Sequence, residues 1–277
     1  MAFPFDNGVA VVTGAAKGIG AQLAHGLASR RCHLALIDRD GDGLAAVAAA
    51  ARRTGVIVTE HRVDVSDGPA IEALPGEVLA RHGRANLLIN NAGVAILGNF
   101  DQIEVADIEW LFAINFWGTV RMCKAFVPLL GREPAAQIVN LSSIYGIIAP
   151  AGQTAYAASK FAVRGFSEAL RHELEDTGIG VSVVHPGGIR TTIAASARVA
   201  PAIDPQDRAS RLAAFDRMVQ TSPEAAAARI IAGIDRREKR ILIGRDARQV
   251  DILQRLFPVS SWAILKRLAA RRSPAAP

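Results

Sequence analysis

Short apolar runs alternate with longer stretches of helical pattern along the chain, and together they predict a layered α/β fold. The runs 138–141 and 181–184 are apolar enough to suit strands that are covered on both faces, as in a parallel sheet. The Ala-rich stretch Leu44–Ala51 predicts a helix, because alanine is the strongest helix former. We therefore expect a doubly wound parallel sheet of seven strands with helices on both faces. The strands are expected at residues 8–13, 33–37, 56–61, 86–90, 136–141, 179–184 and 240–243.

The composition favours a single compact domain. The 277 residues are 50% hydrophobic and 21% charged, which is enough for one large core, and no linker or repeat divides them. Cys32 and Cys123 are too few for a disulfide framework, which favours a reducing compartment. We identify no signal-like start and no apolar run of the roughly 18 residues that a membrane span needs. A soluble cytoplasmic protein is therefore expected.

A glycine-rich turn lies near the start of the chain. The apolar run Val9–Thr13 leads into Gly14–Gly20, which opens the helical pattern 21–30. Such a turn lets the backbone approach a pyrophosphate and directs free N–H groups and the helix dipole toward it. The next strand ends in Asp38, whose carboxylate can accept both hydroxyls of an adenosine ribose. A turn of this kind alone can be structural, but the whole succession predicts a dinucleotide site.

Tyr156 and Lys160 are four residues apart on one predicted helix face, and Ser143 precedes the tyrosine by thirteen residues. A phenol has a pKa near 10, so it is a poor acid-base catalyst at neutral pH. We expect the Lys160 ammonium to favour the phenolate and lower this pKa, while Ser143 binds a substrate oxygen. Without further context, the same spacing would indicate only a helix face with a buried ring and a long amine.

With these motifs in order, the chain resembles the short-chain dehydrogenase/reductase family from about Gly8 to Thr192. The resemblance implies a Rossmann-like fold and a catalytic tetrad of Asn115, Ser143, Tyr156 and Lys160, in which Asn115 bends its helix and holds a water linking Lys160 to solvent. It implies further that Asn90–Gly93 is the fourth-strand motif, Asp64–Val65 lies beside the adenine and His185–Thr191 holds the nicotinamide carboxamide. The expected cofactor contacts are Gly14, Ala16, Lys17, Gly18, Ile19, Gly20, Asp38, Arg39, Asp64, Val65, Asn91, Ala92, Gly93, Tyr156, Lys160, Pro186, Gly187, Ile189 and Thr191.

The activity implied by the resemblance is NAD(P)-dependent interconversion of a secondary alcohol and a ketone. Asp38 would repel a 2′-phosphate and favours NAD, whereas Lys17 and Arg39 resemble the basic residues of NADP-using relatives. An NADPH-dependent carbonyl or 3-oxoacyl-thioester reductase is therefore the alternative. A non-catalytic binding protein on the same fold is a third hypothesis, against which the intact tetrad argues. The histidines show no metal-ligand spacing, so no metal is expected in the chemistry.

The catalytic domain is expected to span residues 1–244, with a lid at about 192–222 that defines the substrate. The lid carries scattered apolar side chains, which indicate either a hydrophobic alcohol or ketone or simple packing of the lid: Ile193, Val199, Ile203, Leu212, Phe215 and Met218. The resemblance also implies a homodimer or homotetramer that pairs through the helices at 107–130 and 155–176.

The remaining segment, 245–277, is a basic extension that is expected to be helical. It holds seven Lys/Arg against two Asp, a net +5 of the chain's +6, so the body is nearly neutral and no nucleic acid partner is expected. Apolar residues recur there at helical spacing, namely Trp262, Leu265, Leu268 and Ala269. This pattern fits a helix packed on the protein itself, or a weak peripheral contact with an anionic membrane.

Overall fold

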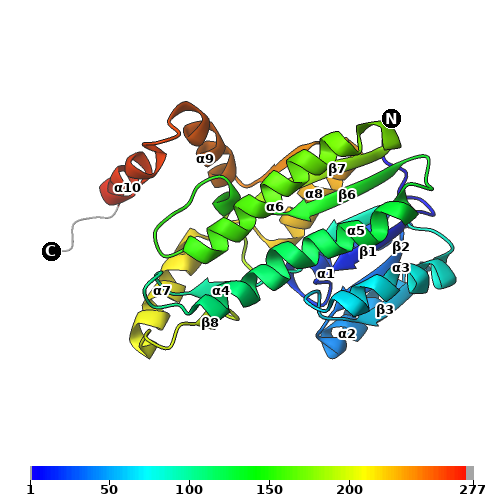
Figure 1. Ribbon diagram of the computed structural model, residues 1–277, viewed down its shortest axis with the longest axis horizontal. Coiled ribbons are helices and arrows are strands. Elements are labelled where there is room, and N and C mark those ends of the chain that lie inside the picture. Colours follow the sequence, from blue (N-terminus) through cyan, green and yellow to red (C-terminus); the bar gives the residue numbers. More distant parts are fainter. Residues whose placement is uncertain (1, 273–277) are drawn as a thin grey trace.

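A computed structural model describes residues 2–272, without the side chains of 214–218 and 268–272. Its centre is a seven-stranded parallel sheet in the order β3-β2-β1-β4-β6-β7-β9 (Figure 1). The seven strands fall within two residues of every predicted position, which confirms the predicted fold. Their bounds are β1 Val9–Thr13, β2 His33–Asp38, β3 Val58–Arg62, β4 Leu87–Asn90, β6 Ala136–Leu141, β7 Ile179–Pro186 and β9 Arg240–Ile243.

Helices cover both faces of this sheet (Figure 1). On one face α1 (Gly18–Ala28) packs between α2 (Gly41–Arg52) and α8 (Pro223–Asp235), and their apolar residues form one core cluster with β1 and β2. On the other face α3 (Gly68–His82), α5 (Thr119–Leu130) and α6 (Thr154–Glu173) enclose a second core cluster. Because both faces are covered, central strands such as β1 and β6 are apolar or buried along their whole length.

The strand order reverses between β1 and β4, which lie side by side although two strands separate them in the chain. In open parallel sheets, ligands bind at the carboxyl ends of the strands on either side of such a reversal. The glycine turn after β1 and the segment after β4 therefore meet at the point where this fold is expected to bind its ligand.

The predicted helix at 107–130 is one helical stretch with a wide turn in its middle. It consists of α4 (Val105–Phe112), the π-helical turn η1 (Ala113–Gly118) and α5. The π-helical turn contains Asn115, whose backbone carbonyl accepts a hydrogen bond from the Thr119 hydroxyl at 3.0 Å. A π-helical turn inserts an extra residue and is frequent at functional sites.

The predicted lid has regular structure that the sequence pattern did not indicate. A two-residue strand, β8 (Arg198–Val199), pairs with β5 (Ile96–Leu97), and α7 (Pro205–Met218) follows. Arg198 donates a hydrogen bond to Asp107 at 2.6 Å, and its guanidinium lies 3.8 Å from the centre of the Trp110 ring. These contacts fasten the lid to α4.

The last described residues form two helices, α9 (Arg245–Leu256) and α10 (Ser261–Arg272), which extend outward at one end of the molecule (Figure 1). Within residues 2–272, no helix combines the length and the apolar content that crossing a bilayer requires. Short 3-10 turns, η2 (Ile144–Gly146) and η3 (Glu175–Thr177), follow β6 and α6.

Candidate active site

The glycine turn has the shape that a close backbone approach requires. Gly14 and Gly18 have positive φ angles of 64° and 57°, a region that favours glycine. A Cβ at Gly20 would lie 2.0 Å from the Gly14 carbonyl oxygen, so no larger residue fits there. Helix α1 begins at Gly18, and the side chain of its N-cap residue, Lys17, makes no capping hydrogen bond. The turn thus offers a helix N-terminus at which an anionic group can bind.

Asp38 lies directly beside this turn. Its carboxylate accepts a hydrogen bond from the Ala16 N–H at 3.0 Å and a second from the Asp40 N–H at 3.0 Å. Arg39 pairs with Asp64 instead, at 3.7 Å and largely in solvent. The carboxylate is therefore held in place, while the neighbouring guanidinium is engaged with another carboxylate. Asp64 and Val65 form the pair that was predicted to lie beside the adenine, and Val65 is buried and packs against Gly118 of the π-helical turn.

Asn91, from the segment after β4, holds the glycine turn to the sheet. Its side-chain amide donates to the carbonyls of Thr13 and Gly14, both at 3.0 Å. The Thr13 hydroxyl in return accepts the N–H groups of Asn91 and Ala92 at 3.0 and 3.1 Å. The predicted residues Asn91 and Ala92 thus meet the turn, and both Asn91 amide hydrogens are committed to the protein backbone.

The segment after β7 completes this side of the site. A Cβ at Gly18 would lie 3.5 Å from the Thr191 methyl carbon, which brings the predicted Pro186–Thr191 segment against the glycine turn. Asp246, at the start of α9, accepts a hydrogen bond from the Gly188 N–H at 2.7 Å. Sequence reasoning missed Asp246, whose partner lies 58 residues earlier in the chain.

Tyr156, Lys160 and Ser143 lie together at the carboxyl end of β6. The Lys160 ammonium is 5.7 Å from the centre of the Tyr156 ring, and it donates a hydrogen bond to the Leu141 carbonyl at 3.0 Å. Ser143 is buried, and its hydroxyl lies close enough to the Tyr156 phenol to act on the pKa of that phenol. The ring of Tyr145 packs edge-on against Tyr156, with the two ring centres 6.2 Å apart. The three predicted residues are therefore neighbours, as the spacing requires.

The protonation of this group differs from the prediction. Burial raises the pKa of Tyr156 to about 12, although the Ser143 hydroxyl acts to lower it. Burial lowers the pKa of Lys160 to about 8. The expected lowering of the tyrosine pKa by Lys160 is thus wrong for the protein alone, because both groups are removed from water and each is driven toward its neutral form.

Asn115 is fixed by the protein around it. Its side chain exchanges two hydrogen bonds with the backbone of Val94, at 2.8 and 3.0 Å, and donates to the Ser159 hydroxyl at 3.1 Å. A Cβ placed on Gly93 would lie 3.3 Å from the Asn115 Oδ1 atom and 3.4 Å from the Lys160 Nζ atom. The side chains of Asn115 and Lys160 thus approach each other across Gly93, so the fourth predicted residue belongs to the same site.

Two further contacts, made by His185 and Ser142, hold the segment around Ser143 in place. The buried His185 ring donates from Nδ1 to the Ser143 carbonyl at 2.9 Å, and burial lowers its pKa to about 4. The Ser142 hydroxyl donates to the Lys160 carbonyl at 2.8 Å and so ties β6 to α6. Sequence reasoning assigned neither contact. The position of His185 just before the Pro-Gly segment was a signal, but its partner lies 42 residues away.

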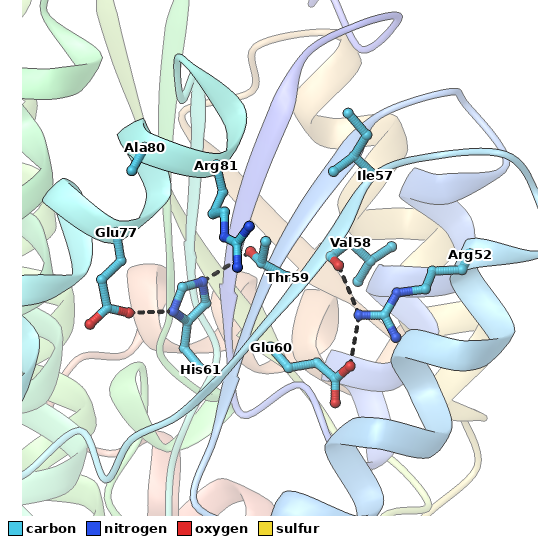
Figure 2. A pocket seen from close by; sticks show the side chains of 9 residues that line it. All are labelled: Arg52, Ile57, Val58, Thr59, Glu60, His61, Glu77, Ala80 and Arg81. Carbon is cyan, nitrogen blue, oxygen red and sulfur yellow. Dashed lines mark hydrogen bonds and ion pairs between the residues drawn. The ribbon is translucent and has the colours of Figure 1, made fainter.

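A separate cavity of about 790 Å³ lies at the outer edge of the sheet, between β3, α2 and α3 (Figure 2). Its walls include no predicted site residue. Figure 2 shows its polar side chains bound to one another: the His61 ring bridges Glu77 at 2.8 Å and Thr59 at 2.9 Å. Arg52 is similarly engaged with Glu60 at 2.7 Å. These mutual contacts fit a structural role for the side chains.

Comparisons with known proteins agree with this geometry. A family model described as short chain dehydrogenase matches residues 8–201. A Mycobacterium tuberculosis (strain ATCC 25618 / H37Rv) protein named as the oxidoreductase SadH is 42% identical over 273 residues, covering 98% of this chain and 98% of its own. A short-chain dehydrogenase/reductase from Burkholderia phymatum, solved with NAD, matches with a TM-score of 0.84 and 30% identity over 99% of both chains. A metagenomic short-chain oxidoreductase solved with NADP matches with a TM-score of 0.63 and 33% identity, over 78% of this chain and 96% of its own.

Proposed function

Because this chain belongs to the short-chain dehydrogenase family and is therefore an oxidoreductase, we propose that it interconverts a secondary alcohol and a ketone with a nicotinamide dinucleotide. The observation that carries this proposal is the grouping of Ser143, Tyr156 and Lys160 at the carboxyl edge of the sheet on which the glycine turn lies. A proton-transfer group and a pyrophosphate-binding turn on one sheet edge are the two parts that such a reaction needs.

The residues present fit the cofactor. The Gly14–Gly20 turn, at the N-terminus of α1, would hold the pyrophosphate, and Asp38 would bind the adenosine ribose. The Pro186–Thr191 segment, fixed by Asp246 through Gly188, would hold the nicotinamide end. When bound, the cofactor supplies or accepts the hydride.

Tyr156 would hold the transferable proton at its hydroxyl, and Ser143 would position the substrate oxygen beside it. Because the pKa of Tyr156 is raised, the protein keeps the phenol protonated, which is the form that donates a proton in ketone reduction. Lys160, whose pKa is lowered to about 8, is the group that first loses its proton as the pH rises. Asn115, which is hydrogen-bonded to Val94 and Ser159, would help to hold the segment after β4 and helix α6, and with it Lys160, in position.

We favour NAD over NADP. The Asp38 carboxylate is fixed by two backbone N–H groups where a 2′-phosphate would lie, and Arg39 is paired with Asp64. A like-charge contact in this half-buried site costs more than an exposed Lys or Arg contributes, since an exposed ion pair contributes up to about 1 kcal/mol. Lys17 makes no ion pair among the described residues and supports the alternative, an NADPH-dependent carbonyl or 3-oxoacyl-thioester reductase.

A hydrophobic substrate is supported by the apolar groups beside Tyr156. Ile144 and Tyr145 are partly exposed next to the catalytic segment and rest on Ile147 and Ile148. In the predicted lid, Ile203 is buried, which fits packing of the lid, whereas Ile193, Val199 and Leu212 keep partial exposure. The side chains of Phe215 and Met218 lie outside the described residues.

Assembly into a homodimer or homotetramer is supported by two large exposed apolar residues on the predicted pairing helices. Trp117 lies in the π-helical turn before α5, and Phe161 lies on α6. Burial of such side chains commonly drives subunit pairing. Light scattering at micromolar concentration measures the assembly, and a monomer there contradicts it.

The test of the proposed reaction is Tyr156→Phe. This substitution removes the transferable proton and keeps the ring, so we expect cofactor binding and the unfolding midpoint to be preserved while turnover falls by about a thousandfold or more. Purified wild type and variant are assayed with a panel of secondary alcohols and ketones and both nicotinamide cofactors. A variant that keeps most of the wild-type rate contradicts the mechanism. Absence of turnover by the wild type across the panel favours the non-catalytic hypothesis.

A further inference from the structure

Exposed apolar side chains gather where α9 meets α10. Of the ten large apolar side chains that are exposed in the described part of the chain, four lie within this short stretch. We call these four the α9–α10 tip: Ile252 is 59% exposed, Leu256 67%, Phe257 47% and Val259 97%. Large apolar side chains held this far into water usually mark a contact surface.

The tip differs from the apolar face that the sequence pattern predicted for the tail. Trp262 and Leu265 pack against the protein's own Ile147, Ile148 and Val250, so that part of the predicted face is covered. The other two predicted residues, Leu268 and Ala269, have side chains outside the described residues. The helix packed on its own subunit is therefore the correct interpretation for Trp262 and Leu265, and these contacts hold α10 so that the tip faces outward.

Hydrogen bonds brace the turn that displays the tip. The Phe257 N–H donates to the Leu253 carbonyl at 2.8 Å, and the Ser261 N–H donates to the Phe257 carbonyl at 2.9 Å. Gln254 bridges the turn, because its side chain accepts from the Ser261 hydroxyl and donates to the Pro258 carbonyl. The exposed side chains are thus carried by an ordered turn that needs no refolding to make a contact.

Positive charge predominates on the two helices that carry the tip. Arg248 on α9 and Lys266 and Arg267 on α10 are exposed, and the sequence contains no Asp or Glu from Ile252 to Pro277. The nearest carboxylate, Asp251, is buried and paired with Arg240 and Arg255. A second copy that paired tip to tip would bring these cations against their own counterparts, which is unfavourable.

We propose that the α9–α10 tip inserts into the interface of an anionic membrane. The apolar side chains of the tip and the exposed Lys and Arg side chains of α9 and α10 are complementary to a membrane interface, which is apolar beneath a layer of anionic headgroups. The apolar groups would partition beneath the headgroups, and the cations would remain among them. This property is independent of the proposed reaction, since none of the tip residues touches the candidate active site.

The experiment is cosedimentation of the full-length protein with phosphatidylcholine vesicles, with and without phosphatidylglycerol. Wild type is expected to bind the mixed vesicles at about 50 mM NaCl and to be released at about 500 mM, because exposed charges are screened at high salt. Leu256→Ser with Val259→Ser should lower the partition coefficient by roughly tenfold or more. Lys266→Glu with Arg267→Glu should abolish the preference for the anionic vesicles.

The matched control is Ile57→Ser with Val105→Ser, which removes two apolar side chains that are 52% and 69% exposed elsewhere on the surface. It should bind vesicles like the wild type, and circular dichroism should show every variant folded. Wild type that stays in the supernatant with anionic vesicles at low salt overturns the proposal, as does a tip variant that binds unchanged. A tip variant that alters only the oligomeric state by light scattering assigns the tip to a second copy and also overturns it.

Discussion

At the residue scale, the consequence of burying Lys160 is a dependence of stability on pH. Its pKa is lowered from an ordinary 10.5 to about 8, so between these pH values the folded state binds fewer protons than the unfolded state. The free energy of unfolding therefore rises with pH across this window, and the gain is lost as the pH falls toward 8. At neutral pH the buried charge costs on the order of 3 kcal/mol.

We predict that Lys160→Met abolishes turnover yet is at least as stable as the wild type at pH 7. Methionine removes the buried charge, although the Leu141 carbonyl loses its donor. Urea unfolding at pH 7 and pH 10 measures the difference, which should shift in favour of the wild type at the higher pH. A difference that does not change between the two pH values would show that Lys160 keeps an ordinary pKa in the folded protein.

Cofactor choice is also decided at one residue. Asp38→Ser should raise the preference for NADP over NAD by roughly tenfold or more in kcat/KM, since the fixed carboxylate goes while Lys17 and Arg39 remain. Asp42→Ser is the matched control, because it removes an exposed carboxylate from the first turn of α2. An unchanged ratio in Asp38→Ser would mean that this carboxylate does not face the ribose.

Local chemistry explains which residues the sequence could reveal. The glycine turn, Asp38 and the Tyr156–Lys160 pair depend on spacing over a few residues, and the structure places each of them at one sheet edge. His185 and Asp246 act through partners 42 and 58 residues away, so no local pattern marks them. The prediction of a lowered tyrosine pKa was wrong because burial, which spacing does not convey, drives both Tyr156 and Lys160 toward their neutral forms.

At the scale of elements, the strands were predictable because a strand covered on both faces must be apolar throughout. The pair β5 and β8 was not predictable, since strands of two residues are too short to carry a pattern and Ile96 pairs with Arg198, far away in the sequence. For Asn115, the family resemblance implied a bent helix but not the π-helical turn. Its side chain is held by Val94 and Ser159, and the sequence around Asn115 does not reveal these partners. The boundary predicted at residue 244 stays a prediction.

The attachment of the lid to α4 gives a prediction at this scale. Arg198→Met keeps the length of the side chain but removes its ion pair with Asp107 and its stacking on Trp110. Together such contacts are worth about 1–2 kcal/mol, so the open lid should become roughly tenfold more populated. Limited proteolysis within residues 192–222 should accelerate accordingly, and KM should rise more than kcat falls.

The control for the lid is Arg52→Met, which removes an ion pair with Glu60 on the opposite part of the sheet. Its lid should be cleaved at the wild-type rate. If both variants are cleaved equally fast, the effect belongs to general loosening of the fold, and Arg198 does not fasten the lid.

At the scale of the whole molecule, the body and the C-terminal helices share one apolar cluster. Trp262 and Leu265 pack on the loop that follows the candidate catalytic strand. Residues 245–277 differ from the rest of the sequence in their net positive charge, but a difference in charge does not show which residues pack against the body. The attachment of these helices to the active-site loop depends on tertiary contacts that no composition shift can reveal.

The hydrogen bond from Gly188 to Asp246 has a consequence for the order of events during synthesis. The turn after β7 that would hold the nicotinamide obtains its support from a residue made 58 positions later. A nascent chain that has emerged only as far as β9 would contain every residue of the predicted tetrad and still have this turn unsupported. The ability to bind cofactor would therefore arise only once Asp246 has been made, and a chain cut between β9 and Asp246 would hold the complete predicted tetrad but bind the cofactor less well.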